Sequence, residues 1–318
     1  MRLFKTLSLG AAAAGLTALA VDWRARVAES AHPPRGKFLE IDGVRLHLME
    51  HGSGAPIVYL HGNGAMIEEV EATGLIDTLS SSNRVIVFDR PGFGHSSRPR
   101  GAPWTPERQA RLIGTALKRL NAAPAVVVAH SWATLVALAL ALDHPELVRG
   151  LVLISGYYFP EPRADVMLAL PSIPVVGDIM RYTVSPAVGW ALSDKIIARA
   201  FAPNRVPARF QAHFPVDMAL RPSQLRAAAE EIGLMMPSAA RLSRRYGELR
   251  CPVALLAGRS DEIVNPQLHT VRLGHVIPQA TMRVLDGVGH MLPHIEPAAV
   301  VGSLTAFMPV GSEVRTPA

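Results

Sequence analysis

The sequence predicts an α/β fold in which a mostly parallel, twisted sheet is flanked by helices and carries an inserted helical cap. Short runs of large apolar residues, such as Val126–Val128, alternate along the chain with apolar stretches of helical length. That alternation is typical of a parallel sheet whose crossovers are helices. It stops over residues 157–249, which are rich in proline and have short expected helices, and it resumes at residue 250. We therefore expect the cap at residues 157–249.

Composition excludes several other classes of protein. The chain has 318 residues, of which 49% are apolar, enough for one large domain with an insertion. Its formal charge is +6, but the basic residues are scattered without interleaved aromatic side chains, so we expect no nucleic-acid binding. The single cysteine, Cys251, excludes an internal disulfide. The histidine spacings lack nearby cysteine or carboxylate ligands, and we find no glycine-rich phosphate loop, so we expect neither a metal nor an organic cofactor.

Residues 1–31 form a separate N-terminal segment. Its basic first residues are followed by the uncharged, alanine- and leucine-rich stretch Leu7–Val21. That stretch is short for a membrane span, which needs about 20 apolar residues. The small-x-small pattern Ala18–Ala20 is typical of a signal-peptide cleavage site, whereas the arginines that follow it would suit an uncleaved anchor. We therefore expect membrane attachment through residues 3–21 or export, and the sequence leaves open which.

Residues 32–156 and 250–318 are expected to form the two halves of the core. A proline-containing stretch from Ser30 to Lys37 is typical of a linker, so we expect a chain that starts near His32 to fold and remain active. The first half opens with a hairpin signal, Asp42-Gly43, between two strand-like segments. The expected strands are residues 38–41, 44–49, 57–60, 84–88, 126–128, 151–154, 253–257 and 282–285. The expected helices are residues 67–79, 105–120, 135–142, 267–276 and 297–307.

Ser131 is the candidate nucleophile. It follows the strand-like run at once and precedes an alanine- and leucine-rich helical run, which is the pattern of a nucleophile elbow. The usual pattern has glycine two residues before and after the serine, and here both positions are alanine, Ala129 and Ala133. A serine hydroxyl needs a base to take its proton and an acid to orient that base.

His290 and Asp261 are the candidate base and acid. Each comes just after an expected strand, and the carboxyl ends of parallel strands meet at one edge of the sheet. The neighbouring Glu262 is an alternative acid. Asp89 also follows a strand, but Arg90 and the Pro-Gly turn beside it indicate a structural ion pair.

His294 lies four residues after His290. It could line the same site, although we expect its partner near the last helix.

Four motifs in this order resemble the α/β-hydrolase fold family. They are His61–Gly64, Asp89–Gly94, the Ser131 elbow, and the late pair Gly258–Asp261 and Gly287–His290. The resemblance covers the chain from Phe38 to Phe307. It implies a Ser131–His290–Asp261 triad. It also implies that the backbone N–H groups of Asn63 and Trp132 bind the oxyanion.

The resemblance is to the serine-dependent branch of the family. Haloalkane dehalogenases and epoxide hydrolases of this fold have aspartate at the elbow, where this chain has Ser131. We expect a hydrolase that cleaves an ester through an acyl-enzyme and takes a small-molecule substrate with an apolar part. A carbon–carbon bond hydrolase or lyase with the same triad is an alternative. A catalytically silent, membrane-attached binding protein is another, which the alanines at the elbow keep open.

Overall fold

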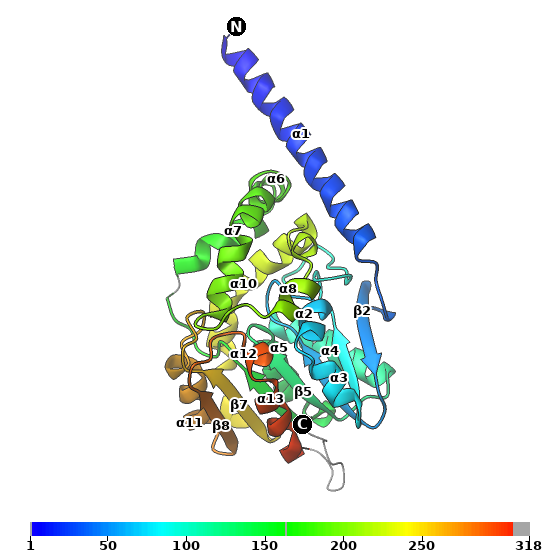
Figure 1. The fold of residues 1–318 in the computed structure, drawn as a ribbon, viewed down its shortest axis with the longest axis vertical. Coiled ribbons are helices and arrows are strands. Elements are labelled where there is room, and N and C mark those ends of the chain that lie inside the picture. Colours follow the sequence, from blue (N-terminus) through cyan, green and yellow to red (C-terminus); the bar gives the residue numbers. More distant parts are fainter. Residues whose placement is uncertain (1, 163, 308–318) are drawn as a thin grey trace.

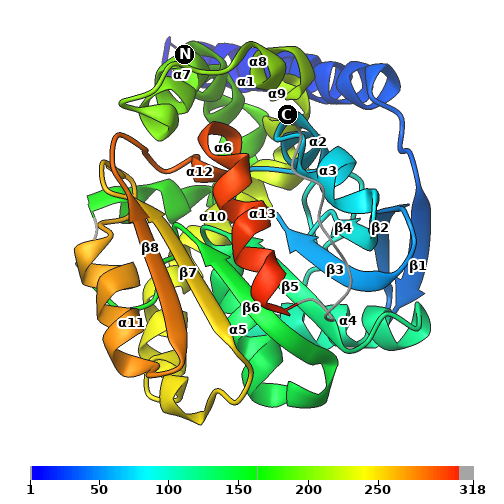
Figure 2. The ribbon, with the colours of Figure 1, turned by 60° about the horizontal axis from the view of Figure 1, so that its bottom comes forward.

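The computed structural model describes residues 2–162 and 164–307. Within them, eight strands form one sheet in the order β1-β2-β4-β3-β5-β6-β7-β8 (Figures 1 and 2). β2 is antiparallel to both of its neighbours, and the other pairs are parallel. The strands are β1 (Lys37–Ile41), β2 (Val44–His51), β3 (Ala55–Leu60), β4 (Asn83–Phe88), β5 (Ala125–His130), β6 (Val148–Ile154), β7 (Val253–Gly258) and β8 (Ala280–Leu285). All the strands that the sequence predicts are confirmed.

Both faces of the sheet are covered, so the central strands are apolar throughout. In β5, Val127 and Ala129 pack toward α4 (Pro106–Arg119), α5 (Ala133–Asp143) and α11 (Arg272–Val276). Val126 and Val128 face the opposite layer, which is formed by the helices α2 (Ile67–Ala72), α3 (Leu75–Ser80), α12 (Leu292–Ile295) and α13 (Pro297–Leu304). Figure 2 shows α13 on one side of the sheet. The strand ends are thereby fixed between two helical layers.

Local residues explain several element boundaries. Asp42 and Gly43 both have positive φ, 50° and 74°, as a two-residue hairpin turn requires. Thr105 caps α4 by accepting a hydrogen bond from the Arg108 N–H. The expected helix over residues 67–79 is two helices, α2 and α3, because Gly74 has a φ of 78° and interrupts it. The expected helix 267–276 begins with a π-helical segment, Gln267–Val271.

The cap lies between β6 and β7 and covers the sheet on the side of the strand ends (Figure 1). It contains short 3-10 turns and five helices within the described residues: α6 (Val176–Tyr182), α7 (Val184–Phe201), α8 (Ala208–His213), α9 (Val216–Ala219) and α10 (Pro222–Leu242). The helical insertion that the sequence predicts is therefore present.

The N-terminal segment forms one helix, α1 (Arg2–Ala31), whose first half extends away from the body of the molecule (Figure 1). Among the described helices, we find none that is both long and apolar enough to cross a membrane. The last third of α1 packs on the cap: Val21 and Ala28 are buried, and Glu29 pairs with Arg221 at 2.6 Å. The expectation that a linker isolates this segment is therefore wrong, because α1 is itself in contact with the cap.

Candidate active site

Ser131 lies in the turn between β5 and α5, with a φ of 55°. Non-glycine residues seldom adopt this left-handed conformation, and it is found at functional turns. The Ser131 N–H donates to the Ile154 carbonyl at the end of β6, at 2.8 Å. Ala129 and Ala133 are fully buried, so the fold accommodates both methyl groups where glycine is usual.

The three candidate residues form one chain of hydrogen bonds. His290 Nε2 lies 2.9 Å from Ser131 Oγ, and His290 Nδ1 lies 2.8 Å from Asp261 Oδ2. His290 and Asp261 are both buried. The carboxylate accepts from Nδ1–H, which leaves Nε2 with a lone pair toward the serine hydroxyl. This tautomer is the one that a general base requires.

Asp261, rather than Glu262, contacts the histidine. Its Oδ1 accepts from the N–H groups of Ile263 and Val264 at 2.8 and 2.9 Å, and these bonds hold its Oδ2 toward His290. The Glu262 side chain is 63% exposed and lies 4.0 Å from Arg199. The loop after β7 therefore directs the two neighbouring carboxylates in different directions.

His130 holds the backbone of His290 through a hydrogen bond, a contact that the sequence did not predict. Its Nε2–H donates to the His290 carbonyl at 3.0 Å, and the two rings lie 5.1 Å apart. Burial, together with the nearby His290, lowers the pKa of His130 to about 4. The ring is therefore neutral at pH 7 and adds no charge beside the base. Its position directly before Ser131 was the only available signal.

The loop His61–Gly64, hereafter the oxyanion loop, packs directly on the elbow. A Cβ added at Gly62 would lie 3.2 Å from the Cβ of Ser131. Within the described residues, neither the Asn63 nor the Trp132 backbone N–H donates to another group. Both N–H groups are thus without a partner among the described residues, in segments that adjoin Ser131.

The sequence model of the alpha/beta hydrolase fold family matches residues 55–297 of this chain. The chain belongs to the α/β-hydrolase fold family. The predicted fold and family are thus confirmed, and the eight-stranded sheet with its serine elbow agrees with them.

Relatives of this α/β-hydrolase have different names. Haloalkane dehalogenase 2 of Mycobacterium tuberculosis is 25% identical over 286 residues, covering 86% of this chain and 94% of the relative. The 2-hydroxymuconate semialdehyde hydrolase of a Pseudomonas species is 35% identical over 131 residues, covering 40% and 46%. The structure of an enol-lactonase from Burkholderia xenovorans has a TM-score of 0.68 at 21% identity, covering 85% and 99%. Because these names denote different activities, the similarity does not show which type of bond this protein cleaves.

An apolar cavity of about 530 Å³ adjoins the site. Its lining includes Asn63 of the oxyanion loop and Met291, the neighbour of His290. Helices α7 and α10 form much of its wall with side chains such as Leu192 and Ile232. Its size and apolar lining are typical of small-molecule sites.

Asp89 does not pair with Arg90, which corrects the expected ion pair. Its Oδ2 accepts from His47 Nδ1–H at 2.7 Å and from the His95 N–H at 2.9 Å. Although burial opposes it, the hydrogen bond from His47 lowers the pKa of Asp89. Asp89 is therefore a buried structural carboxylate, held by β2 instead of by its neighbour.

His294 pairs with Glu69 on α2 at 2.6 Å, and both side chains are buried. The partner thus belongs to α2, 225 residues away in the sequence, and not to α13 itself. Although burial opposes it, the hydrogen bond from His294 lowers the pKa of Glu69. Within the described part of the chain, we find no group of histidine, cysteine and carboxylate side chains that could hold a metal ion.

Proposed function

We propose that this protein is a serine hydrolase that cleaves an ester through an acyl-enzyme. The observation that carries the proposal is the hydrogen-bonded chain from Ser131 through His290 to Asp261 at a strained elbow. Ser131 Oγ attacks the acyl carbonyl, and its proton passes to His290 Nε2. His290 then protonates the leaving alcohol and later activates the water that hydrolyses the acyl-enzyme.

Asn63 and Trp132 stabilise the negative charge of the tetrahedral intermediate through their backbone N–H groups. Fixed donors in a site shielded from water contribute several kcal/mol, about 3 to 4 for one donor that is lost. The apolar cavity beside Asn63 supports a substrate with an apolar part. These residues need no metal or organic cofactor for the reaction.

The residue at the elbow argues against dehalogenase chemistry. A dehalogenase of this fold attacks with an aspartate, and this chain has Ser131. A carbon–carbon bond hydrolase with the same triad is the second candidate, because the semialdehyde hydrolase is 35% identical over 131 residues. Turnover of esters of graded acyl length, compared with turnover of a vinylogous 1,5-diketone, distinguishes the two.

A fluorophosphonate probe tests the proposal. We expect it to label Ser131 covalently, and we expect Ser131→Ala to abolish both labelling and ester turnover. His290→Ala should suppress labelling, because without a base the hydroxyl is hardly nucleophilic. Ser155→Ala is the matched control, since Ser155 also has positive φ at a strand end but is buried, with no partner for its hydroxyl among the described residues. A folded wild-type protein that resists the probe would favour the silent binding protein.

We also propose that the N-terminal helix attaches the enzyme to a membrane surface. Leu16, Leu19, Trp23 and Val27 are exposed and share one face of α1. The cap helix α6, which packs beside α1, adds exposed Val176 and Ile179. The full chain should float with phospholipid vesicles, and a chain lacking residues 1–20 should not. Equal flotation of both would contradict the proposal.

A further inference from the structure

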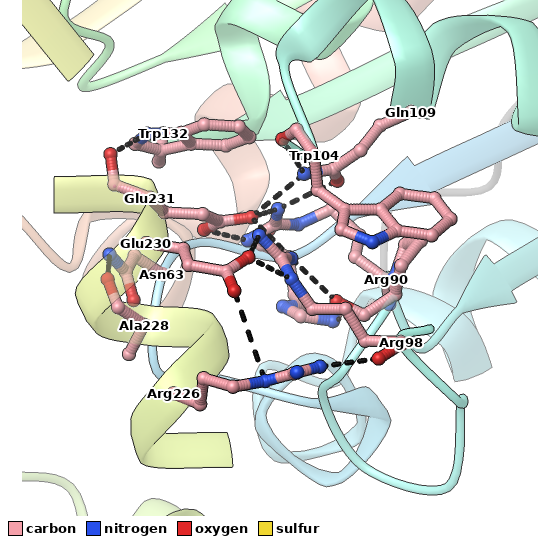
Figure 3. Close-up of polar contacts among 12 residues, drawn as sticks. Asn63, Arg90, Arg98, Trp104, Gln109, Trp132, Arg226, Ala228, Glu230 and Glu231 are labelled. Carbon is pink, nitrogen blue, oxygen red and sulfur yellow. Dashed lines mark hydrogen bonds and ion pairs between the residues drawn. The ribbon is translucent and has the colours of Figure 1, made fainter. Parts of the chain in front are cut away.

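The cap helix α10 contacts the oxyanion loop directly. The Asn63 side-chain amide donates to the Ala228 carbonyl at 3.0 Å (Figure 3). The Gln224 side-chain amide donates to the Gly64 carbonyl at 3.3 Å. The helix that lines the apolar cavity therefore also holds the loop that carries one oxyanion donor.

Arg90 connects the same loop to α10 through a buried ion pair (Figure 3). Its guanidinium donates to the His61 carbonyl at 2.7 Å and to the Gly62 carbonyl at 2.9 Å. On its other side it pairs with both carboxylate oxygens of Glu231. Arg90 and Glu231 are fully buried, and Gln109 bonds to both of them. A guanidinium fork suits this arrangement because it fixes two carbonyls and a carboxylate in one plane.

The backbone of Glu231 also contacts the side chain of Trp132, the residue that carries the second oxyanion donor. The Trp132 indole N–H donates to the Glu231 carbonyl at 2.9 Å. The Arg90 guanidinium lies 5.1 Å from the centre of the Trp132 ring. Glu231 thus contacts Arg90, which bonds to the oxyanion loop, through its carboxylate, and Trp132 through its backbone carbonyl.

We propose that Glu231 is a positioning residue that keeps the backbone donors of Asn63 and Trp132 aligned on Ser131. This inference rests on the proposed function. Glu231 touches no reacting atom and acts through Arg90 and Trp132. Removing its charge leaves Arg90 buried without a counterion, and the guanidinium then reorients together with the carbonyls that it holds. Oxyanion donors depend steeply on position, so a shift of about 1 Å costs about 100-fold in rate.

Glu231→Gln tests the proposal against Glu230→Gln. Glu230 is the adjacent residue of α10, is a quarter exposed, and has an ion pair with Arg98 at 2.7 Å. Arg98 is buried and also lies 4.0 Å from Glu231, but within the described residues neither Glu230 nor Arg98 bonds to the oxyanion loop. The readouts are kcat and KM for an ester, with kcat divided by the number of sites that the fluorophosphonate titrates. A third readout is the affinity for an alkyl boronic acid, whose serine adduct carries an oxyanion.

We expect Glu231→Gln to lower kcat per titrated site by about 10- to 100-fold, with KM within about threefold of wild type. The affinity for the boronic acid should fall by a similar factor, and Glu230→Gln should change each quantity by less than about threefold. A merely structural role would reduce the number of titrated sites and the melting temperature. It would leave kcat per site and boronic acid affinity unchanged, and that result overturns the proposal.

Arg90→Lys decides the question if Glu231→Gln fails to fold. Lysine keeps the positive charge beside Glu231 but cannot bond both carbonyls with a planar fork. We expect the same loss of kcat per site and of boronic acid affinity, and an unchanged kcat per site overturns the proposal. If the wild-type protein neither turns over esters nor reacts with the probe, the proposed function itself has failed, which is a distinct outcome.

Discussion

At the scale of single residues, the orientation of one carboxylate decides which acid serves His290. Both oxygens of Asp261 accept hydrogen bonds, one set from the loop and one from the histidine. Glu262, its neighbour in sequence, is exposed and lies near Arg199 instead. The hydrogen bonds of the loop after β7, and not the residue types, separate these two side chains.

We therefore predict that Asp261→Asn loses far more ester turnover than Glu262→Gln. An asparagine amide can donate to Nδ1, so it no longer requires the tautomer with a proton on Nδ1. The base then takes the wrong tautomer, and in a serine protease triad the same change lowers kcat by about four orders of magnitude. Glu262→Gln should change turnover by less than about twofold, because it only removes an exposed charge. Steady-state kinetics on one ester measures both. Similar activity in the two variants would show that another group orients His290.

At the scale of elements, α1 has two parts with different surroundings. Its first half extends from the body, and its last third lies against the cap (Figure 1). Val21 and Ala28 are each 4% exposed, and the Arg24 guanidinium lies 3.9 Å from the Trp190 ring. The helix therefore holds any membrane attachment at a fixed place relative to the cap.

We predict that a chain starting at Val21 keeps the stability of the full chain, whereas one starting at His32 loses part of it. The second truncation removes the buried Val21 and Ala28 and the Glu29–Arg221 pair. These contacts contribute on the order of 3 kcal/mol, mostly from burial, since Glu29 is half exposed. Thermal unfolding should show a decrease of about 5 °C for the shorter chain. Equal melting temperatures would mean that α1 contributes nothing to the cap.

At the scale of the whole molecule, buried histidines make stability depend on pH. Burial, together with the nearby Arg90, lowers the pKa of His61 to about 4, and the pKa of His130 is lowered to about 4 in the same way by burial and His290. Both are neutral in the folded state and bind protons in the unfolded state below pH 6.5. His47 and Glu68 oppose this trend: the hydrogen bond to Asp89 raises the pKa of His47 despite burial, and burial raises the pKa of Glu68 to about 7. The two lowered histidines therefore lose stability toward acid while these two groups offset part of that loss.

We predict that the free energy of unfolding falls as the pH decreases from about 6.5 to about 4. Over this range the unfolded chain binds more protons than the folded chain at His61 and His130, so each contributes a loss of roughly 3 kcal/mol. Below about pH 4 both states are protonated at these two positions, and their contribution stops changing. Urea unfolding at pH 7.5 and 4.5 measures the loss.

His130→Gln should reduce this pH dependence by roughly the share of one histidine, about 2 to 3 kcal/mol. His213→Gln is the matched control, because His213 is exposed on α8. If His130→Gln and the control show the same dependence as wild type, the pKa of His130 is the same in the folded and unfolded chains. The conclusion that burial lowers the pKa of His130 would then be wrong.

The sequence by itself determined the sheet, the position of the cap and the order of the motifs. Strand runs such as Val126–Val128 and turn residues such as Asp42-Gly43 act through local geometry, so they can be read without knowing their neighbours. The same locality explains why Ser131, Asp261 and His290 could be proposed together: each follows a strand, and parallel strands end at one edge.

Only the tertiary structure decided which side chains pair. Arg90 pairs with Glu231, 141 residues away, and not with its neighbour Asp89. Asp89 instead accepts a hydrogen bond from His47 of β2. A buried charge needs a counterion wherever the fold provides one, and no local pattern records which distant helix passes closest. The packing of α1 on the cap is a second example. Contacts between elements far apart in sequence depend on how their side chains fit together, which the periodicity of each element does not predict.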